Sequence, residues 1–338
     1  MTRFAACIII FIFLAVICLP ALVVSTGRLD NQAAAPSPSL TSGKFAAGPG
    51  EVLIKVWDHR TGKLEEMTLE QYVPGVVAAE MPASFEEEAL KAQAVIARTY
   101  VLAQIRDGGG RGCDKHPSAD ICTDPTHCQA WVSEHDAKEK WAFYQQTSYW
   151  NKIVSAVRDT KDMVVTYQGE PVDAVFHSTC GGHTENSEEV WSASLPYLKG
   201  VTCTYCTHSP WTEKKFTYTL QEFSRLVSSC PQASPASAYL QPAFTVMDKS
   251  TSNRLKTLKV NNLSFTGNEL RNLLNLPSTR VRWSVEGNNI VFTANGYGHG
   301  VGLCQYGADG MAKEGYNYKE ILSHYYQGVE IVSVKKPL

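Results

Sequence analysis

The sequence predicts an α+β fold, built from mixed helices and mainly antiparallel β hairpins, behind an N-terminal transmembrane anchor. Three observations support this fold class. Helical and hairpin patterns are segregated along the chain instead of alternating regularly. Capping signatures mark two neighbouring helix starts near residues 68 and 84. Residues 5–24 are uncharged and nearly all apolar, about the length that crosses a bilayer as a helix.

The chain divides into an anchor, a linker and a folded domain. Residues 1–25 are expected to be the anchor, because a cleaved signal peptide normally has a shorter apolar stretch and a clearer cleavage site. Arg3 precedes this stretch, which places the rest of the protein outside the cytoplasm. Residues 26–50 are rich in Ala, Pro, Ser and Gly and predict a flexible tether. The folded domain then covers 51–338 and can include a subdomain at about 200–290.

The elements of the folded domain follow from periodicity and from turn residues. Residues 51–57 alternate as a strand, and two helices follow, the first with Thr68 and Gln71 and the second with Ser84 and Glu87 as capping pairs. Met81-Pro82 separates them. The later predictions are an ordered loop over 108–131, a helix over 141–158, a hairpin over 163–176, a strand and helix over 212–230, a strand, helix and hairpin over 255–292, and two helices and a strand at the C-terminus.

Charge and cysteine content restrict the function. Lys plus Arg number 31 and Asp plus Glu 33, so the formal net charge is −2 and no basic field for nucleic acid is expected. Of the ten cysteines, eight follow the anchor. In an extracytoplasmic compartment they can form disulfides or bind metal, and the sequence alone does not pair them.

Glu80 is the glutamate whose position indicates chemistry. Three others, at 86–88, fall in the first turn of the second helix, where capping and the helix dipole account for them. Glu80 falls in the last turn of the first helix, at the negative end of its dipole, and follows the apolar run VVAA. Both effects raise the pKa of a carboxyl group, as a general acid requires. The alternative is an exposed helix-end glutamate without a role.

Two cations share one face of the second helix. Lys91 and Arg98 are seven residues apart, and Arg98 lies within an apolar stretch, where it needs a partner. We expect Glu80 to be that partner. For Lys91 the alternative is a solvated helix face.

Three separated motifs resemble one known family. The stretch GVVAAEMPASFEEEALKAQAVIART over 75–99, the later GGHTENSEEVW and the C-terminal GYGHGVGLCQYGA closely resemble the stage II sporulation protein D family of endospore-forming bacteria. The resemblance implies a peptidoglycan lytic transglycosylase that acts on peptide-denuded glycan strands during engulfment of the forespore. It implies Glu80 as catalytic acid/base and Arg98 as its supporting residue. It also implies two partners, a sporulation wall amidase and a polytopic membrane protein, and a location at the cell membrane facing the space around the forespore.

The motif loops supply the expected substrate-binding residues. With Lys91, these are Ser178, Gly181, Thr184 and Glu188 in the first loop, and His299 and Gln305 in the second. Glycines allow close approach of backbone to a glycan, although a surface turn and tight helix packing are the simpler explanations of the two loops.

The loop from Cys113 to Trp131 is the expected zinc site. By resemblance to clostridial-type members of the family, Cys122 and His127 bind zinc, and Cys113, Cys128, Asp124, water or substrate can complete the site. The alternative is a disulfide from Cys113 to Cys122 or Cys128.

The remaining cysteines carry weaker expectations. For Cys203 and Cys206, with His208 nearby, we expect a structural role, as a local disulfide or as idle thiols. Cys180 and Cys304 replace serine-like residues of the family pattern and can pair with each other.

Two other functions remain open at this point. One is a zinc-dependent cell-wall hydrolase, in which the Cys122 and His127 loop activates water. The other is a non-catalytic wall-binding protein. A transglycosylase needs one carboxyl group, whereas ordinary glycoside hydrolysis uses two.

Overall fold

The fold combines a group of packed helices with several small sheets. The computed structural model describes residues 51–106, 109–191, 193–229 and 242–334. The expected anchor and linker therefore lie outside the described residues. In the part that is described, no helix combines the length and the apolar character needed to span a membrane.

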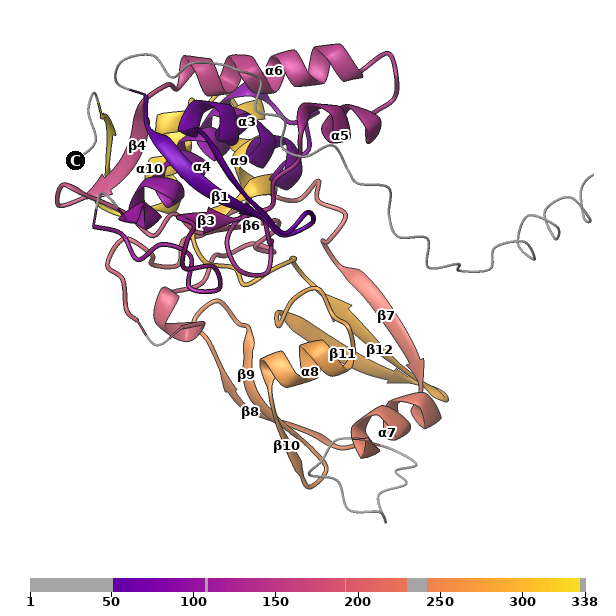
Figure 1. The fold of residues 1–338 in the computed structure, drawn as a ribbon. Coiled ribbons are helices and arrows are strands. Elements are labelled where there is room, and N and C mark those ends of the chain that lie inside the picture. The colour runs from indigo at the N-terminus through magenta and orange to yellow at the C-terminus, as the bar shows by residue number, and fades with distance from the viewer. Residues whose placement is uncertain (1–50, 107–108, 192, 230–241, 335–338) are drawn as a thin grey trace, which may run out of the picture. The chain divides into compact units, whose positions relative to one another are not determined.

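The helical group combines helices from the first half of the chain with helices from its C-terminal part (Figure 1). It contains α3 (Leu69–Glu80), α4 (Glu87–Gln104), α5 (Glu134–Glu139), α6 (Gln146–Asp159), α9 (Gln305–Lys313) and α10 (Tyr318–Tyr325). Helix α4 contacts α3, α6, α9 and α10, and eleven of its residues are buried. The C-terminal helices thus pack against the helix that follows Glu80.

Three small sheets adjoin these helices. The first has the order β2-β1-β3 and the second β14-β4-β5, while β13 and β6 form a parallel pair. Their bounds are β1 (Leu53–Asp58), β2 (Lys63–Thr68), β3 (Ile121–Cys122), β4 (Met163–Tyr167), β5 (Glu170–Pro171), β6 (Phe176–His177), β13 (Leu303–Cys304) and β14 (Glu330–Ser333). A short 3-10 helix, η3, covers Ser187–Glu189. The two-residue strands β3 and β13 end directly at cysteines.

The segment from β7 to β12 has a hydrophobic core of its own. Its sheets have the orders β11-β12-β7 and β10-β9-β8. The bounds are β7 (Lys214–Thr219), α7 (Leu220–Ser228), β8 (Phe244–Lys249), β9 (Leu255–Val260), β10 (Leu263–Thr266), α8 (Gly267–Leu273), β11 (Val281–Glu286) and β12 (Asn289–Ala294). Among the described residues, the buried cluster that joins them runs from Leu220 to Ala294 and stays within this segment.

Local capping explains the start of α3 but not that of α4. Thr68 and Gln71 form the predicted capping box, with bonds of 3.3 and 2.9 Å between side chain and backbone. The predicted Ser84 cap is wrong, because α4 begins at Glu87 and its first turn has no side-chain cap. The Glu86 N–H instead donates to Asp309 Oδ1 at 2.8 Å, so a residue of α9 serves this turn.

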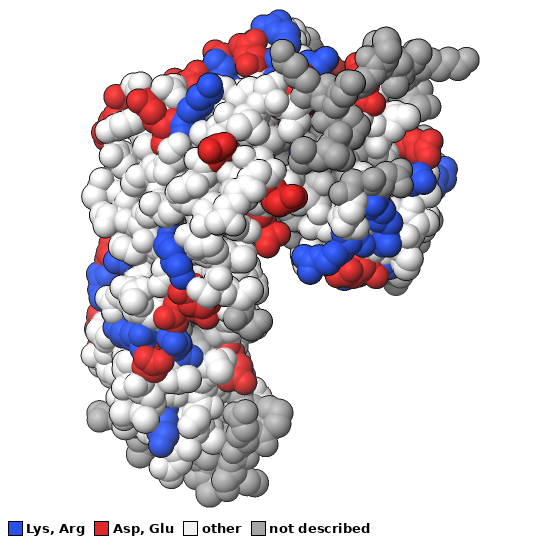
Figure 2. Space-filling view, turned by 90° about the vertical axis from the view of Figure 1, so that its left-hand side faces the viewer, with Lys and Arg blue, Asp and Glu red and all other residues white. Residues whose placement is uncertain are grey.

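Most of the other predicted elements are present. Gln168 and Gly169 have φ of 54° and 87° and form the tight turn between β4 and β5. The helix expected over 141–158 begins later, at Gln146, and α5 precedes it. Acidic and basic side chains are interspersed on the face drawn in Figure 2, in keeping with the small net charge. The overall class is therefore α+β with several antiparallel sheets.

Candidate functional site

Glu80 is the last residue of α3, as its sequence context predicts. The chain leaves the helix through Met81, which is extended, and Pro82, which cannot continue a helix. The Glu80 side chain is half-buried, and Oε1 accepts a hydrogen bond of 2.7 Å from the Ala130 N–H. Burial raises the pKa of Glu80, and the Ala130 hydrogen bond opposes that rise without cancelling it. The carboxyl group is thus oriented by one donor and holds its proton to a higher pH than a free glutamate.

The backbone of Glu80 is held by a residue of the second motif loop. Gln305 Nε2 donates to the Glu80 carbonyl oxygen at 3.0 Å and lies 3.3 Å from Gln93 Oε1. Gln305 is buried at the start of α9, and Gln93 is fully buried on α4. These contacts join α3, α4 and α9 at the catalytic candidate. Gln93 was missed as a site residue, although an uncharged polar side chain within the apolar run of α4 was a signal for it.

The loop that presents Ala130 is fastened to the middle of α3. Trp131 Nε1 donates to the Tyr72 carbonyl oxygen at 3.1 Å, and the Val132 N–H donates to the Gly75 carbonyl oxygen at 3.3 Å. A Cβ on Gly75 would lie 2.3 Å from Trp131 Nε1 and 2.5 Å from the Val132 oxygen. The loop therefore reaches α3 only because residue 75 is a glycine.

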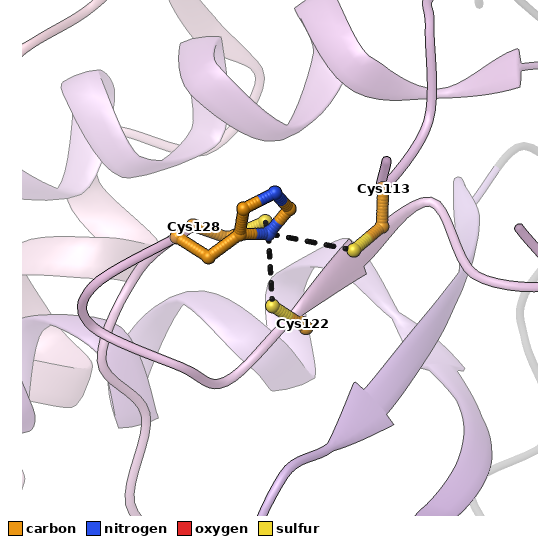
Figure 3. A group of neighbouring side chains, drawn as sticks. Cys113, Cys122 and Cys128 are labelled. Atoms are coloured by element: carbon orange, nitrogen blue, oxygen red, sulfur yellow. Dashed lines mark hydrogen bonds between the residues drawn. The ribbon is translucent and has the colours of Figure 1, made fainter. Parts of the chain in front are cut away.

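Directly before Ala130, three cysteines and one histidine converge. The imidazole Nδ1 of His127 lies 3.6 Å from Cys113 Sγ, 3.4 Å from Cys122 Sγ and 3.4 Å from Cys128 Sγ. Figure 3 shows the sulfurs of Cys113 and Cys122 directed at the same imidazole nitrogen, with Cys128 beside the ring. The four ligand atoms lie within 4.8 Å of one another, and we call them the cysteine-histidine cluster. All of these cysteines are free thiols in the structure.

The spacing of the cysteine-histidine cluster fits one tetrahedral zinc ion. With zinc–sulfur and zinc–nitrogen bonds of about 2.3 and 2.0 Å, tetrahedral angles put nitrogen about 3.5 Å from each sulfur. The three distances above match that value. Asp124, an alternative ligand, instead bonds Lys115 Nζ at 3.0 Å and the Thr126 N–H at 2.8 Å. Four protein ligands would leave no open position on the ion, which is the arrangement of structural zinc sites.

The expected contact between Arg98 and Glu80 is wrong. The Arg98 guanidinium is buried and bonds Glu70 in two places, with Nε to Oε1 at 2.7 Å and a terminal nitrogen to Oε2 at 2.9 Å. It also donates to the carbonyl oxygens of Met163 and Val157. Glu70 lies in the first turn of α3, whereas Glu80 ends it, so Arg98 stabilises the opposite end of that helix.

Lys91 lies in a network of acidic residues. Its Nζ is 2.9 Å from both Glu87 Oε1 and Glu88 Oε1 and 3.9 Å from Asp159 Oδ2. These ion pairs join the first turn of α4 to the end of α6. Its expected contact with a glycan stays a prediction.

The residues expected from the first motif loop have different environments. Thr184 is buried, and its hydroxyl accepts from the Val201 N–H at 2.8 Å, which holds the loop together. Glu188 is exposed and pairs with Lys199 at 2.6 Å. Ser178 is half-buried beside Thr179, at 3.3 Å between the hydroxyls, and Gly181 has a positive φ of 76°. Thr184 is therefore committed to the loop, whereas Glu188 is the exposed member of this group and its expected contact with a glycan stays a prediction.

His299 is held in its neutral form. Burial lowers its pKa to about 4. Its Nε2 donates to the Phe176 carbonyl oxygen at 2.8 Å, and its Nδ1 accepts from the Val301 N–H at 3.2 Å. Both ring nitrogens are thus occupied, and the half-exposed Trp191 lies against the ring, 5.1 Å between centroids.

Comparisons with known proteins agree on one family. The family model described as stage II sporulation protein matches residues 58–167. The chain is 35% identical to stage II sporulation protein D of Bacillus subtilis over 83% of its own length and 79% of that protein, and 34% identical to the Bacillus amyloliquefaciens protein of the same name over 83% and 78%. It is 29% identical to the amidase enhancer of Bacillus subtilis over 77% of its length and 40% of that protein.

Proposed function

The chain belongs to the stage II sporulation protein D family, and on that premise we propose that it is a peptidoglycan lytic transglycosylase of sporulation. Its substrate would be glycan strands without peptides, cut between N-acetylmuramic acid and N-acetylglucosamine during engulfment of the forespore. The observation that carries the proposal is the carboxyl group of Glu80, which is half-buried, raised in pKa and oriented by the Ala130 N–H. Among the described residues, no second carboxylate is hydrogen-bonded to it or contributes to its pKa shift.

One carboxyl group suffices for this reaction. Protonated Glu80 gives its proton to the glycosidic oxygen, and the bond from that oxygen to the muramyl C1 breaks. The carboxylate then takes the proton of the muramyl 6-hydroxyl, whose oxygen bonds to C1. The products are an N-acetylglucosamine end with a free hydroxyl and a 1,6-anhydromuramyl end. Glu80 ends protonated again, and water is not consumed.

The neighbours of Glu80 have positioning roles in this proposal. The Ala130 N–H fixes the carboxylate, and Gln305 fixes the backbone to which it is attached. Zinc in the cysteine-histidine cluster would supply rigidity to the loop, because Ala130 follows the ligand Cys128 by two residues. Ser178 and Glu188 would contact the glycan, and His299 and Thr184 would shape the loops that carry them.

The setting of the reaction is also a proposal. Residues 1–25 would anchor the protein in the membrane, and the 26–50 linker would let the folded domain reach the wall from the extracytoplasmic side. The similarity to a protein named amidase enhancer supports cooperation with a wall amidase, which would remove the peptides first. A polytopic membrane protein is the other expected partner.

The geometry favours this reaction over the two alternatives. A zinc-dependent hydrolase needs an open position for water, and the cysteine-histidine cluster offers four protein ligands. A wall-binding protein has no need for a glutamate whose protonated form is stabilised by burial.

Mass spectrometry of reaction products tests the proposal. Amidase-treated glycan strands are incubated with the full chain in detergent and with two variants, Glu80→Gln and Glu86→Gln. Glu86 is an exposed glutamate that makes no side-chain cap, so its variant is the matched control. We expect anhydromuramyl ends from the wild type and from Glu86→Gln, and a loss of at least about 100-fold with Glu80→Gln. Hydrated reducing ends would show a hydrolase, and intact strands with all three proteins would show a binding role.

A further inference from the structure

A second cysteine cluster lies apart from the site described above. Its members are Cys180, Cys203, Cys206 and Cys304, and we call it the four-cysteine cluster. The four sulfurs lie within 4.8 Å of one another, and each of the four residues is at most 3% exposed. All four are free thiols in the structure. Three chain segments that are far apart in the sequence thus bring four sulfurs into one buried pocket.

The spacing of these sulfurs corresponds to a single tetrahedral ion. Zinc–sulfur bonds of about 2.3 Å at tetrahedral angles place sulfurs about 3.8 Å apart. Cys180 Sγ and Cys206 Sγ are 3.5 Å apart, and no pair exceeds 4.8 Å. A disulfide would require about 2.0 Å between two of them. A cluster of several iron atoms would hold the four sulfurs further apart than one ion does.

Three backbone N–H groups point at sulfurs of the four-cysteine cluster. Cys304 Sγ accepts from the Cys180 N–H at 3.2 Å and from the Gly307 N–H at 3.3 Å, and Cys180 Sγ accepts from the Gly182 N–H at 3.4 Å. The Tyr325 hydroxyl lies 3.1 Å from Cys203 Sγ. Backbone N–H groups directed at sulfur stabilise negative charge on it and fix the ligand geometry.

The dipole of α9 and a buried arginine also favour negative charge on the four-cysteine cluster. Cys304 is the N-cap of α9, so its sulfur lies at the positive end of that helix dipole. The buried Arg254 guanidinium donates to the Cys180 carbonyl oxygen at 3.0 Å. One divalent cation with four thiolates carries two net negative charges, which both features offset.

We propose that Cys180, Cys203, Cys206 and Cys304 bind one Zn²⁺ ion as a closed structural site. The site is distinct from the cysteine-histidine cluster and does not rest on the transglycosylase reaction. It would fasten the first motif loop, the segment around Cys203 and the start of α9 to one another. Gly307 of α9 lies directly against this segment, since a Cβ there would come within 2.7 Å of Cys203 Sγ. The ion would thereby hold Gln305, the residue next to Cys304, against Glu80.

Metal content of the full chain, purified in detergent with zinc and reductant, tests the inference. We compare the wild type with Cys122→Ser/His127→Ala, which disrupts the cysteine-histidine cluster, and with Cys203→Ser/Cys206→Ser, which disrupts the four-cysteine cluster. With both clusters occupied, the wild type holds two zinc ions, and each double variant holds one. Each variant is thus the control for the other. A wild type with one ion, retained when Cys203 and Cys206 are replaced, would overturn the proposal.

Two measurements on the wild type need no variant to fold. After exchange into Co²⁺, the sulfur-to-metal charge-transfer absorption should correspond to seven thiolates, whereas occupation of the cysteine-histidine cluster alone gives three. The second is peptide mapping of wild-type protein that has been purified without reductant and alkylated at once. If the freshly purified protein contains two disulfides among Cys180, Cys203, Cys206 and Cys304, these cysteines are cross-linked covalently and the metal site is refuted.

Discussion

The substitution Gly75→Ala should lower the free energy of unfolding, although alanine favours the helix itself. Within a helix, alanine is favoured over glycine by about 1 kcal/mol. The new Cβ would, however, lie 2.3 Å from Trp131 Nε1 and 2.5 Å from the Val132 oxygen. Ordinary contacts begin near 3.4 Å, so these groups must move by about 1 Å. Overpacking costs about 1–3 kcal/mol, and loss of the Trp131 bond to Tyr72 adds about 1 kcal/mol. The net expectation is a loss of about 1–3 kcal/mol.

The same movement should disable Glu80. Ala130 precedes Trp131, and a shift of about 1 Å would lengthen its 2.7 Å bond to Glu80 beyond hydrogen-bond range. A misplacement of that size can reduce turnover by about 100-fold. Urea unfolding and the rate of anhydromuramyl release, measured under conditions where each variant is folded, report the two effects.

Gly62→Ala is the matched control for this prediction. Gly62 lies in the turn between β1 and β2 with φ of 67°, and nothing lies within 4 Å of its missing Cβ. Alanine there is strained by its backbone conformation, so stability should fall by about 1 kcal/mol while turnover is kept. If Gly75→Ala were as stable as the wild type and equally active, the tight contact between the loop and α3 would have no role.

Three other substitutions separate positioning from chemistry. Burial raises the pKa of Glu80, so ionisation of this group destabilises the folded state as the pH rises above the unfolded-state pKa of about 4.3. Glu80→Gln should therefore be more stable than the wild type between about pH 4 and neutrality. Urea titrations should show no such gain below about pH 4. Glu70→Gln removes the charged partner of buried Arg98 and should lower the free energy of unfolding by about 3 kcal/mol, with the pH profile of activity unchanged. A shifted pH profile would instead indicate that Arg98 acts in the active site. Gln305→Leu should lower kcat with little change in KM, because Gln305 holds Glu80; a raised KM alone would instead make it a substrate contact.

Local rules located the catalytic candidate correctly. The capping box at Thr68 and the stop at Met81-Pro82 define both ends of α3, and together they place Glu80 in its last turn. The same kind of rule found the turn at Gln168-Gly169 and the strand and helix after Thr212, but it missed β8 and β10. In each case the signal and the structure it specifies lie within a few residues of each other.

Contacts between distant residues were beyond such rules. Asp309, which serves the turn before α4, is 223 residues from its partner Glu86. Arg98 of α4 was expected to pair with Glu80. It pairs instead with Glu70, which is 28 residues away in sequence and lies at the opposite end of α3 from Glu80. The four-cysteine cluster joins residues up to 124 apart, and only the Cys203-x-x-Cys206 pair was visible as a local motif. Cysteines in place of serine-like residues at 180 and 304 were noticeable in the sequence, but the sequence did not show that they lie beside Cys203 and Cys206.

The two cysteine clusters lie next in sequence to the two residues that hold Glu80. Glu80 is the last residue of α3, so no following turn of the helix packs against its side chain. One support comes from Ala130, two residues after Cys128, and the other from Gln305, one residue after Cys304. Ions in both clusters, as proposed, would fix each support at a ligand. Loss of the ion from the cysteine-histidine cluster should then release the Glu80 carboxylate, whereas loss of the ion from the four-cysteine cluster should release its backbone. The first change should alter the pH dependence of turnover, and the second should lower turnover at every pH.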